Sequence, residues 1–410
     1  MAFPYNISGN DVWQGVRTTG SMNTDFIKVD IEDRMYRVEP SSYPLQAYLF
    51  MQKNKAIETV HPQTKHEWPE DELTPASDKL TAGATGGGAT MNIYPTEIDL
   101  YFVGMRVKFP DTDETGYVSS VAGYASSYVT VTKDTGTWTT LASGAYVKLL
   151  GYAGSENGDP PTMVSTKAVV LFNYCQIFQT SVKMTDRQIM ASMGGGFYAG
   201  NWWDNEVDKK GKEHKLGIEN SMWHNTIAQA ARQSDYSYKT LCNGVIQQII
   251  DGGGLYQPYS KWDEEAFDLF LLKKKLGSNN LTFFVGDDLA YDCEKIVKLK
   301  YGNIGQVKKY GAVAYNEGLD VFTYQGVGKT VDIIRVPSPI FDDKYSKMGV
   351  LLDDGYIKLV HAGKDKKGSR KQRFEMGIQA NGQPREEAQF LSDVSPCVVN
   401  PAIHQICYAQ

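Results

Sequence analysis

Apolar and polar residues alternate in short runs between residues 93 and 155, and this pattern predicts β-strands. The runs are IDLYFVGMRVKF, GYVSSVA, SYVTVTK, TWTTLA and AYVKLLGYA, and they are separated by Gly, Asp and Ser. A period of two between turn residues is typical of strands that are buried on one face. We therefore predict a small β-barrel or sandwich, inserted at residues 93–160.

A second pattern, over residues 204–232, predicts a long and charged helix. Several pairs of opposite charges lie four residues apart, and apolar residues recur at helical spacing. Asp204 is the expected N-cap. A helix of that length would be a rod of about 43 Å. Gly211 and Gly217 are expected to weaken or bend it.

Residues 240–340 alternate helical and strand-like segments, which predicts a sheet flanked by two helices. The helices are expected at 262–277 and 290–302, and a buried strand at 281–288. A shorter helical pattern is present at residues 42–52. Taken together, these segments predict an α+β fold.

Residues 57–90 carry few apolar side chains, three prolines and a Gly/Ala/Thr-rich end. This composition is typical of a disordered loop, but it also fits a two-stranded projection that lies on a neighbouring molecule. In the second interpretation, one aromatic and four acidic residues are the candidate contacts between subunits. They are Glu67, Trp68, Glu70, Asp71 and Glu72.

A basic run near the C-terminus is the second candidate contact. It consists of Lys364, Lys366, Lys367, Arg370, Lys371 and Arg373. A solvated loop would explain it. It would also suit contact with an acidic surface of a neighbour, such as residues 67–72, or weak contact with enclosed DNA.

Charge and cysteine content narrow the classes of function. The formal net charge is −6, and residues 1–200 carry all of the acidic excess. A protein that grips nucleic acid needs a basic field, which this chain lacks overall. Its five cysteines are scattered and odd in number, which predicts buried free thiols in a reducing compartment. We expect no signal peptide and no membrane span.

No catalytic motif is complete, so we expect neither enzymatic activity nor a cofactor or metal ion. The segment GVGKT (residues 326–330) resembles the end of a phosphate-binding loop, but Thr323 stands where the first glycine is required. The doublet Asp353–Asp354 is more typical of a turn than of a pair of catalytic carboxylates.

The order of these segments resembles that of tailed-bacteriophage major capsid proteins with the Hong Kong 97-type fold, in the group that carries a small β-rich insertion. The resemblance rests on EIDLYFVGMRVKF and the strands that follow it, and on STKAVVLFNYCQIFQTSVKMT. In that group a similar Asn-Tyr-x-Gln-Ile-Phe strand precedes a long spine helix. HEWPEDELTPASD likewise resembles the group's extended loop. The match covers most of residues 25–405.

The resemblance implies a domain plan. It consists of an N-terminal arm and first strand (1–52), an extended loop (53–92), the inserted β-rich domain (93–160), a peripheral domain with the spine helix (161–235), an axial domain (236–335) and a return to the peripheral domain (336–410).

The resemblance also implies a structural role in the virion. Synthesised in host cytoplasm, the chain would assemble as hexamers and pentamers into an icosahedral shell. The shell would enclose double-stranded DNA with weak, non-specific contact. Portal, scaffolding and decoration proteins would be its other partners. The alternative hypothesis is a phage tail or surface protein whose β domain recognises a receptor.

Overall fold

The computed structural model divides the chain into two compact units, and the second is inserted into the first. Unit 1 comprises Met1–His66 and Asn173–Gln410, and unit 2 comprises Glu67–Phe172. The structure describes residues 43–51, 56–59, 65–122, 127–154, 156, 159–190, 202–229, 239–274, 276–301, 307–310, 319–363 and 370–409. The predicted N-terminal arm lies outside these residues as far as residue 42.

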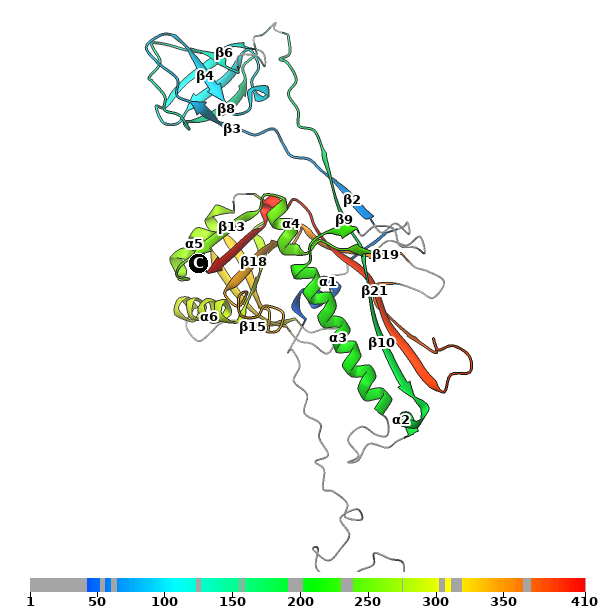
Figure 1. Cartoon of the computed structure of the whole chain (residues 1–410). Helices are drawn as coiled ribbons and strands as arrows, with labels where there is room; N and C mark the ends of the chain where they lie inside the picture. Colours follow the sequence, from blue (N-terminus) through cyan, green and yellow to red (C-terminus); the bar gives the residue numbers. More distant parts are fainter. Residues whose placement is uncertain are drawn as a thin grey trace, which may run out of the picture. The chain divides into compact units, whose positions relative to one another are not determined.

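Unit 1 contains six α-helices among its described residues (Figure 1). They are α1 (Pro44–Met51), α2 (Asp186–Met190), α3 (Trp202–His224), α4 (Val245–Asp251), α5 (Glu264–Lys273) and α6 (Asp287–Tyr301). The predicted short helix at 42–52 is therefore confirmed as α1. The helices predicted at 262–277 and 290–302 are confirmed as α5 and α6, with shifted ends.

The larger sheet of unit 1 has seven strands in the order β13-β22-β18-β14-β17-β16-β15. Their bounds are β13 (Leu255–Tyr259), β14 (Asn280–Val285), β15 (Val307–Tyr310), β16 (Leu319–Gly326), β17 (Lys329–Arg335), β18 (Met348–Asp353) and β22 (Gln405–Ala409). We predicted that residues 336–410 would return to a different domain. That boundary is wrong for β18 and β22, which pair directly into this sheet.

Adjacent residues of β14 show how this sheet is covered on both faces. Phe283 packs in a cluster with α5 and α6, whereas Phe284 packs with α1, α3 and α4. Successive side chains of a strand point to opposite faces. A strand that is covered on both sides therefore has a continuous apolar run, which is why LTFFV was recognisable as buried.

The second sheet of unit 1 has the order β1-β19-β21-β10, and β20 also pairs with β21. Its strands are β1 (Ala56–Thr59), β10 (Gln176–Thr185), β19 (Ile357–Ala362), β20 (Arg373–Met376) and β21 (Arg385–Val398). Helix α3 lies along β10 and β21 (Figure 1), and Trp203 packs there against Val182, Met184 and Ala388. Two short strands, β11 (Ala228–Gln229) and β12 (Thr240–Leu241), pair with each other.

The long helix was predicted correctly in position but not in extent. Helix α3 begins at Trp202, so Asp204 lies in its first turn and is not the N-cap. It ends at His224, eight residues before the predicted end at 232. The next residue, Asn225, accepts a hydrogen bond from the backbone N–H of Gly244 and donates one to Gln176 (both 2.8 Å). These tertiary bonds compete with continuation of the helix.

Unit 2 is a closed six-stranded barrel with the order β3-β4-β7-β6-β5-β8. Its strands are β3 (Ser77–Ala82), β4 (Thr90–Pro95), β5 (Met105–Phe109), β6 (Glu114–Val121), β7 (Val129–Lys133) and β8 (Tyr146–Tyr152), and a 3₁₀ turn covers Ile98–Leu100. Trp138 fills the interior and meets Phe109 edge to face at 5.2 Å. A Cβ at Gly116 would lie 2.3 Å from the carbonyl oxygen of Thr132, so only glycine fits there.

The barrel was predicted from the sequence, but its start at residue 93 was wrong. Strand β3 and the first half of β4 precede that position. Strand β3 turns only Asp78 and Leu80 inward, so it presents no apolar run that would identify it. All five cysteines are buried and free, which confirms that part of the prediction.

Candidate subunit-contact surfaces and a buried polar cluster

The acidic candidate residues lie on and just after strand β2 (Lys65–Glu70), which pairs with β9 (Val169–Tyr174). Glu67 is exposed, while Trp68 and Glu70 are half-buried. The indole Nε1 of Trp68 donates a hydrogen bond to Glu70 Oε1 at 2.7 Å. Residues 57–90 therefore do not form a two-stranded projection by themselves. The partner of β2 is β9, which follows the barrel in the sequence.

Asp71 and Glu72 continue from this strand and are exposed. The hydroxyl of Thr166 donates to Asp71 Oδ1 at 2.9 Å and to the carbonyl oxygen of Glu72 at 2.5 Å. The segment that leaves the barrel is thereby joined to the segment that enters it. Both acidic side chains remain open to solvent beside the β2–β9 ribbon.

Strand β9 adds an apolar surface that is not among the contact residues predicted from the sequence. Val169, Val170 and Phe172 are all exposed on it. The signal was present in the run KAVVLFNY, since a strand of a two-stranded ribbon has no core to cover so many apolar side chains. We define these three residues as the ribbon patch.

The described part of the basic run makes contacts within its own chain. Arg370 Nε lies 3.6 Å from a carboxylate oxygen of Asp393, and Arg373 lies 2.8 Å from Glu375. The ammonium of Lys371 lies 4.4 Å from the ring centre of Phe50. The other three candidates are not among the described residues: Lys364, Lys366 and Lys367.

These contacts show that the described part of the basic run is not simply exposed to solvent. Arg370, Lys371 and Arg373 are all partly buried, so they are not a purely solvated loop. Burial raises the pKa of Asp393, while the neighbouring guanidinium of Arg370 acts in the opposite direction. The acidic candidates from Glu67 onward belong to unit 2 and the basic run to unit 1.

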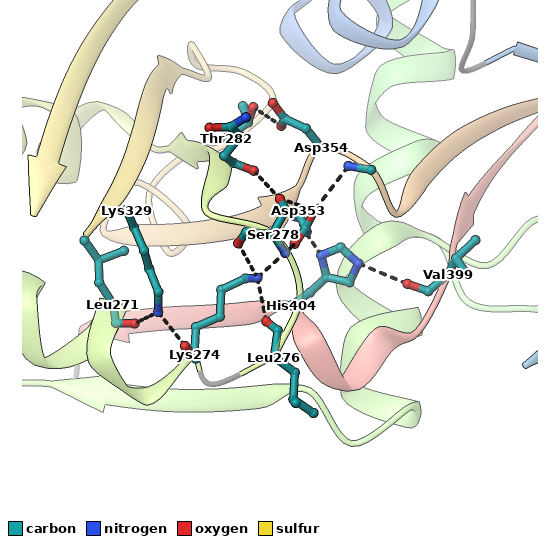
Figure 2. Close-up of polar contacts among 12 residues, drawn as sticks. Leu271, Lys274, Leu276, Ser278, Thr282, Lys329, Asp353, Asp354, Val399 and His404 are labelled. Carbon is teal, nitrogen blue, oxygen red and sulfur yellow. Dashed lines mark hydrogen bonds and ion pairs between the residues drawn. The ribbon is translucent and has the colours of Figure 1, made fainter. Parts of the chain in front are cut away.

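Figure 2 shows a buried polar cluster at the end of the seven-stranded sheet. Lys274 Nζ donates to Asp353 Oδ2 at 2.9 Å, and the two side chains are 1% and 0% exposed. Ser278 donates to the same carboxylate from its backbone N–H (2.6 Å) and from its hydroxyl (2.8 Å). His404 Nδ1 accepts the backbone N–H of Asp353 at 3.1 Å.

The electrostatics of this cluster favour an ionised Asp353. Burial raises its pKa, but the hydrogen bonds from Lys274 and Ser278 outweigh burial and hold the pKa below its usual value. Lys274 also donates to the carbonyl oxygen of Leu276 at 2.8 Å. A buried charge is tolerated when it is paired and hydrogen-bonded in this way.

Asp354, the second member of the doublet, ties α1 to the sheet. Its Oδ1 accepts hydrogen bonds from Tyr48 Oη and Thr282 Oγ1, each at 2.5 Å. The doublet does adopt a turn, as predicted, since the backbone N–H of Tyr356 bonds to the carbonyl oxygen of Asp353. The sequence could not reveal that both carboxylates also join segments that are far apart in the chain.

This cluster can stabilise the fold but cannot meet a substrate, because solvent does not reach the Lys274–Asp353 pair. Within the described ranges, no group of three or more His, Cys, Asp or Glu side chains is arranged to hold a metal ion. None of the helices in those ranges is both long and apolar enough to cross a bilayer.

A second buried carboxylate, Glu219 of α3, holds the start of α1. It accepts the backbone N–H groups of Leu45 (2.8 Å) and Gln46 (2.9 Å), and the indole N–H of Trp223 (3.1 Å). An acid at a helix N-terminus satisfies donors that the helix itself leaves open. Burial nevertheless raises the pKa of Glu219 to about 7.

The segment GVGKT is a hairpin turn and not a phosphate-binding loop. Gly326 and Lys329 pair across β16 and β17, and Val327 and Gly328 form the turn between them with φ of 51° and 72°. Lys329 Nζ donates to the carbonyl oxygens of Leu271 and Lys274, so its ammonium is already bound. GVGKT therefore has the geometry of a β-hairpin and not that of the loop its sequence resembles.

In a comparison with known protein families, one family model matches this chain. The family model described as SU10 major capsid protein matches residues 17–402. A search of the curated proteins finds no match.

Solved structures match the fold of this chain at very low sequence identity. The cyanophage A-1(L) capsid chain is 8% identical with a TM-score of 0.50, and the match covers 95% of this chain and 99% of that one. A chain from the capsid of a native GTA particle is 8% identical with a TM-score of 0.47, covering 95% and 98%. A chain of Microbacterium phage Oxtober96 is 10% identical with a TM-score of 0.46, covering 94% and 97%.

Proposed function

Because the chain belongs to the SU10 major capsid protein family, we propose that its copies assemble as hexamers and pentamers into a closed icosahedral shell around double-stranded DNA. Membership rests on the family match, which spans residues 17–402. The chain is thus a structural protein of a virion capsid, and its fold is the α+β Hong Kong 97-type fold predicted from the sequence. The family match gives no support to the tail-protein alternative.

The ribbon patch supports a specific mode of assembly. Val169, Val170 and Phe172 are exposed on β9, and the acidic residues Glu67 and Asp71 lie on or beside its partner strand. An exposed apolar ribbon with a polar rim is typical of a surface that a protein partner covers. In our proposal the ribbon is the extended loop, and it lies on a neighbouring subunit in the shell.

The seven-stranded sheet with α5 and α6 is, in this proposal, the axial domain near the capsomer centre. The five-stranded sheet with α3 is the peripheral domain. This division assigns each sheet to one domain. It replaces the domain boundary at residue 335 that the resemblance implied. The basic run from Lys364 to Arg373 would meet an acidic surface of a neighbour or enclosed DNA only weakly, because several of its cations already have partners in the same chain.

The proposal also covers the place of synthesis, catalytic activity and the other partners of the chain. We infer synthesis in host cytoplasm, no catalytic activity, and contacts with portal, scaffolding and decoration proteins. The formal charge of −6 fits a wall that holds its DNA without binding it tightly. Repeated weak interfaces suffice for such a shell, because each contact made raises the effective concentration for the next.

Negative-stain electron microscopy of the purified full-length chain, with light scattering on the same sample, tests this proposal. Closed shells, or rings of five and six copies, are the expected result. A stable trimer or an open tube would contradict it.

The variant Val170→Asp tests the role of the ribbon patch separately from the other parts of the proposal. It should give folded subunits that fail to close shells, because a charge replaces an apolar contact in the ribbon patch. The matched control is Val103→Asp, which makes the same change at an exposed valine of the barrel. If Val170→Asp closes normal shells, the ribbon is not a subunit contact.

A further inference from the structure

Three Asn-Gly pairs occur in the sequence, and the structure puts two of them in opposite surroundings. They are Asn157–Gly158, Asn243–Gly244 and Asn381–Gly382. The first pair lies outside the described residues. The second is buried immediately before α4, and the third is exposed in the turn between β20 and β21. The same two residue types can therefore be compared in two different tertiary environments.

An asparagine that precedes a glycine can react with its own backbone. The backbone nitrogen of the glycine attacks Cγ of the asparagine, a bond forms between these two atoms, and the bond from Cγ to Nδ2 breaks. The proton of the glycine N–H leaves with the amide nitrogen as ammonia, and a cyclic imide (succinimide) remains. Glycine favours this attack because it has no side chain to hinder the approach and adopts a wide range of backbone angles.

The turn at Asn381–Gly382 leaves both reacting groups free. Asn381 and Gly382 are exposed, and Gly382 has φ 85° with no atom within 4 Å of the position of a Cβ. Among the residues that the structure describes, none forms a hydrogen bond with the Gly382 N–H or with the Asn381 side chain. The turn is closed beside them, where the backbone N–H of Gln383 bonds to the carbonyl oxygen of Ala380 at 3.4 Å.

The same groups are held in place at Asn243–Gly244. The Gly244 N–H donates to the carbonyl oxygen of Asn225 at 2.8 Å. Asn243 is 6% exposed, and its Oδ1 accepts the backbone N–H of Ile227 at 3.3 Å. A Cβ at Gly244 would lie 2.6 Å from the carbonyl oxygen of Trp223, so the surrounding chain leaves this pair little room to move. Reaction at this pair requires a local opening of the structure first.

We propose that Asn381 is a site of spontaneous deamidation, which converts the β20–β21 turn from neutral to acidic as the folded chain ages. Water opens the succinimide by adding OH to one of the two ring carbonyl carbons and H to the ring nitrogen. Opening at Cγ gives aspartate, and opening at the main-chain carbonyl carbon gives isoaspartate. The overall change is loss of ammonia and gain of water, so water is the only other reactant. The inference concerns the chain itself and does not rest on the proposed function.

Both products change the turn. Each adds a negative charge, and isoaspartate also adds one carbon atom to the main chain. The backbone N–H of Ile378 bonds to the carbonyl oxygen of Glu387 at 3.2 Å, and that of Asp186 bonds to the carbonyl oxygen of Pro384 at 3.3 Å. These bonds tie the turn to β21 and to the start of α2, so a longer main chain at residue 381 disturbs a segment that both elements contact.

Peptide mass spectrometry of the full-length chain, aged in mildly alkaline buffer, tests the proposal. Trypsin releases residues 374–385 and 240–261, each with a single asparagine, so the two sites are measured separately. In the folded chain the first peptide should gain the mass that replaces NH₂ by OH and should contain both aspartate and isoaspartate. Asn243 should convert at least about tenfold more slowly, because its reaction waits for a local opening. Unfolding in urea should bring the two rates close together.

Asn381→Gln is the matched variant, because its longer side chain keeps the amide but forms the cyclic imide far less readily. It should remove the isoaspartate signal, measured by isoaspartate-specific enzymatic methylation, and leave the circular dichroism spectrum unchanged. An unchanged Asn381 in the folded chain would overturn the proposal, whether or not it reacts in urea. Equal rates at Asn381 and Asn243 before unfolding would also overturn it. Aspartate without isoaspartate would contradict it as well, because hydrolysis would then bypass the succinimide.

Discussion

At the scale of single residues, burial decides what a charged side chain does. Lys274 and Asp353 are fully buried and bonded to each other at 2.9 Å, whereas Lys298 and Glu294 form an even shorter pair (2.6 Å) on the surface of α6. Removing one partner of a buried pair leaves an uncompensated charge in the interior. Removing one partner of an exposed pair changes little, because water replaces it.

Asp353→Ala should therefore lower the free energy of unfolding of unit 1 by about 3–5 kcal/mol, since Lys274 would lose its partner without access to water. Urea unfolding followed by circular dichroism measures this change. Lys298→Ala is the control and should cost less than about 1 kcal/mol. Equal effects of the two substitutions would show that the buried pair does not stabilise the fold as described.

At the scale of elements, two glycines of α3 have opposite surroundings. A Cβ added at Gly217 would meet no atom within 4 Å. At Gly211 it would approach the ring of Phe390 on β21 to 3.2 Å. The sequence predicted only that both glycines weaken the helix. The packing of α3 on its sheet makes one of them replaceable and gives the other a close neighbour.

Gly217→Ala is expected to stabilise unit 1 by about 0.5–1 kcal/mol, because alanine has less conformational freedom to lose in a helix and meets no obstacle. Gly211→Ala should gain less or even destabilise, since the Phe390 ring must shift. Urea midpoints of the two variants and the wild-type chain give the comparison. A larger gain at Gly211 than at Gly217 would contradict the packing.

At the scale of the whole molecule, the inserted unit is distinct in both core and charge. Its apolar cluster draws only on residues of the barrel region, from Leu80 to Leu149. Residues 67–172 carry 6 Lys and Arg against 13 Asp and Glu, which accounts for more than the full net charge of −6. The remaining chain is close to neutral. A unit with its own closed sheet and core has the properties of an independent domain.

A fragment of residues 67–172 should accordingly fold alone. We expect a cooperative thermal transition and a near-ultraviolet circular dichroism signal from the packed Trp138. Trp138→Ala is the matched variant and should lower the stability of the fragment by about 3–5 kcal/mol through the cavity that it leaves. A wild-type fragment without a cooperative transition would show that the barrel depends on unit 1.

The sequence by itself determined the features that local periodicity encodes. The alternation in β5 to β8, the apolar run of β14 and the amphipathic pattern of α5 each identify an element from neighbouring residues. The resemblance in segment order identified the fold class and the family. These features depend on contacts within an element or on the face that it buries.

Only the tertiary structure decided which distant segments meet. It paired β2 with β9 across the whole barrel, brought β18 and β22 into the seven-stranded sheet, and ended α3 where Asn225 bonds to other segments. It also set the role of Asp353, which the sequence shows only as a turn residue. The physical reason is that burial and pairing between residues far apart in the chain leave no periodic signal in either segment alone.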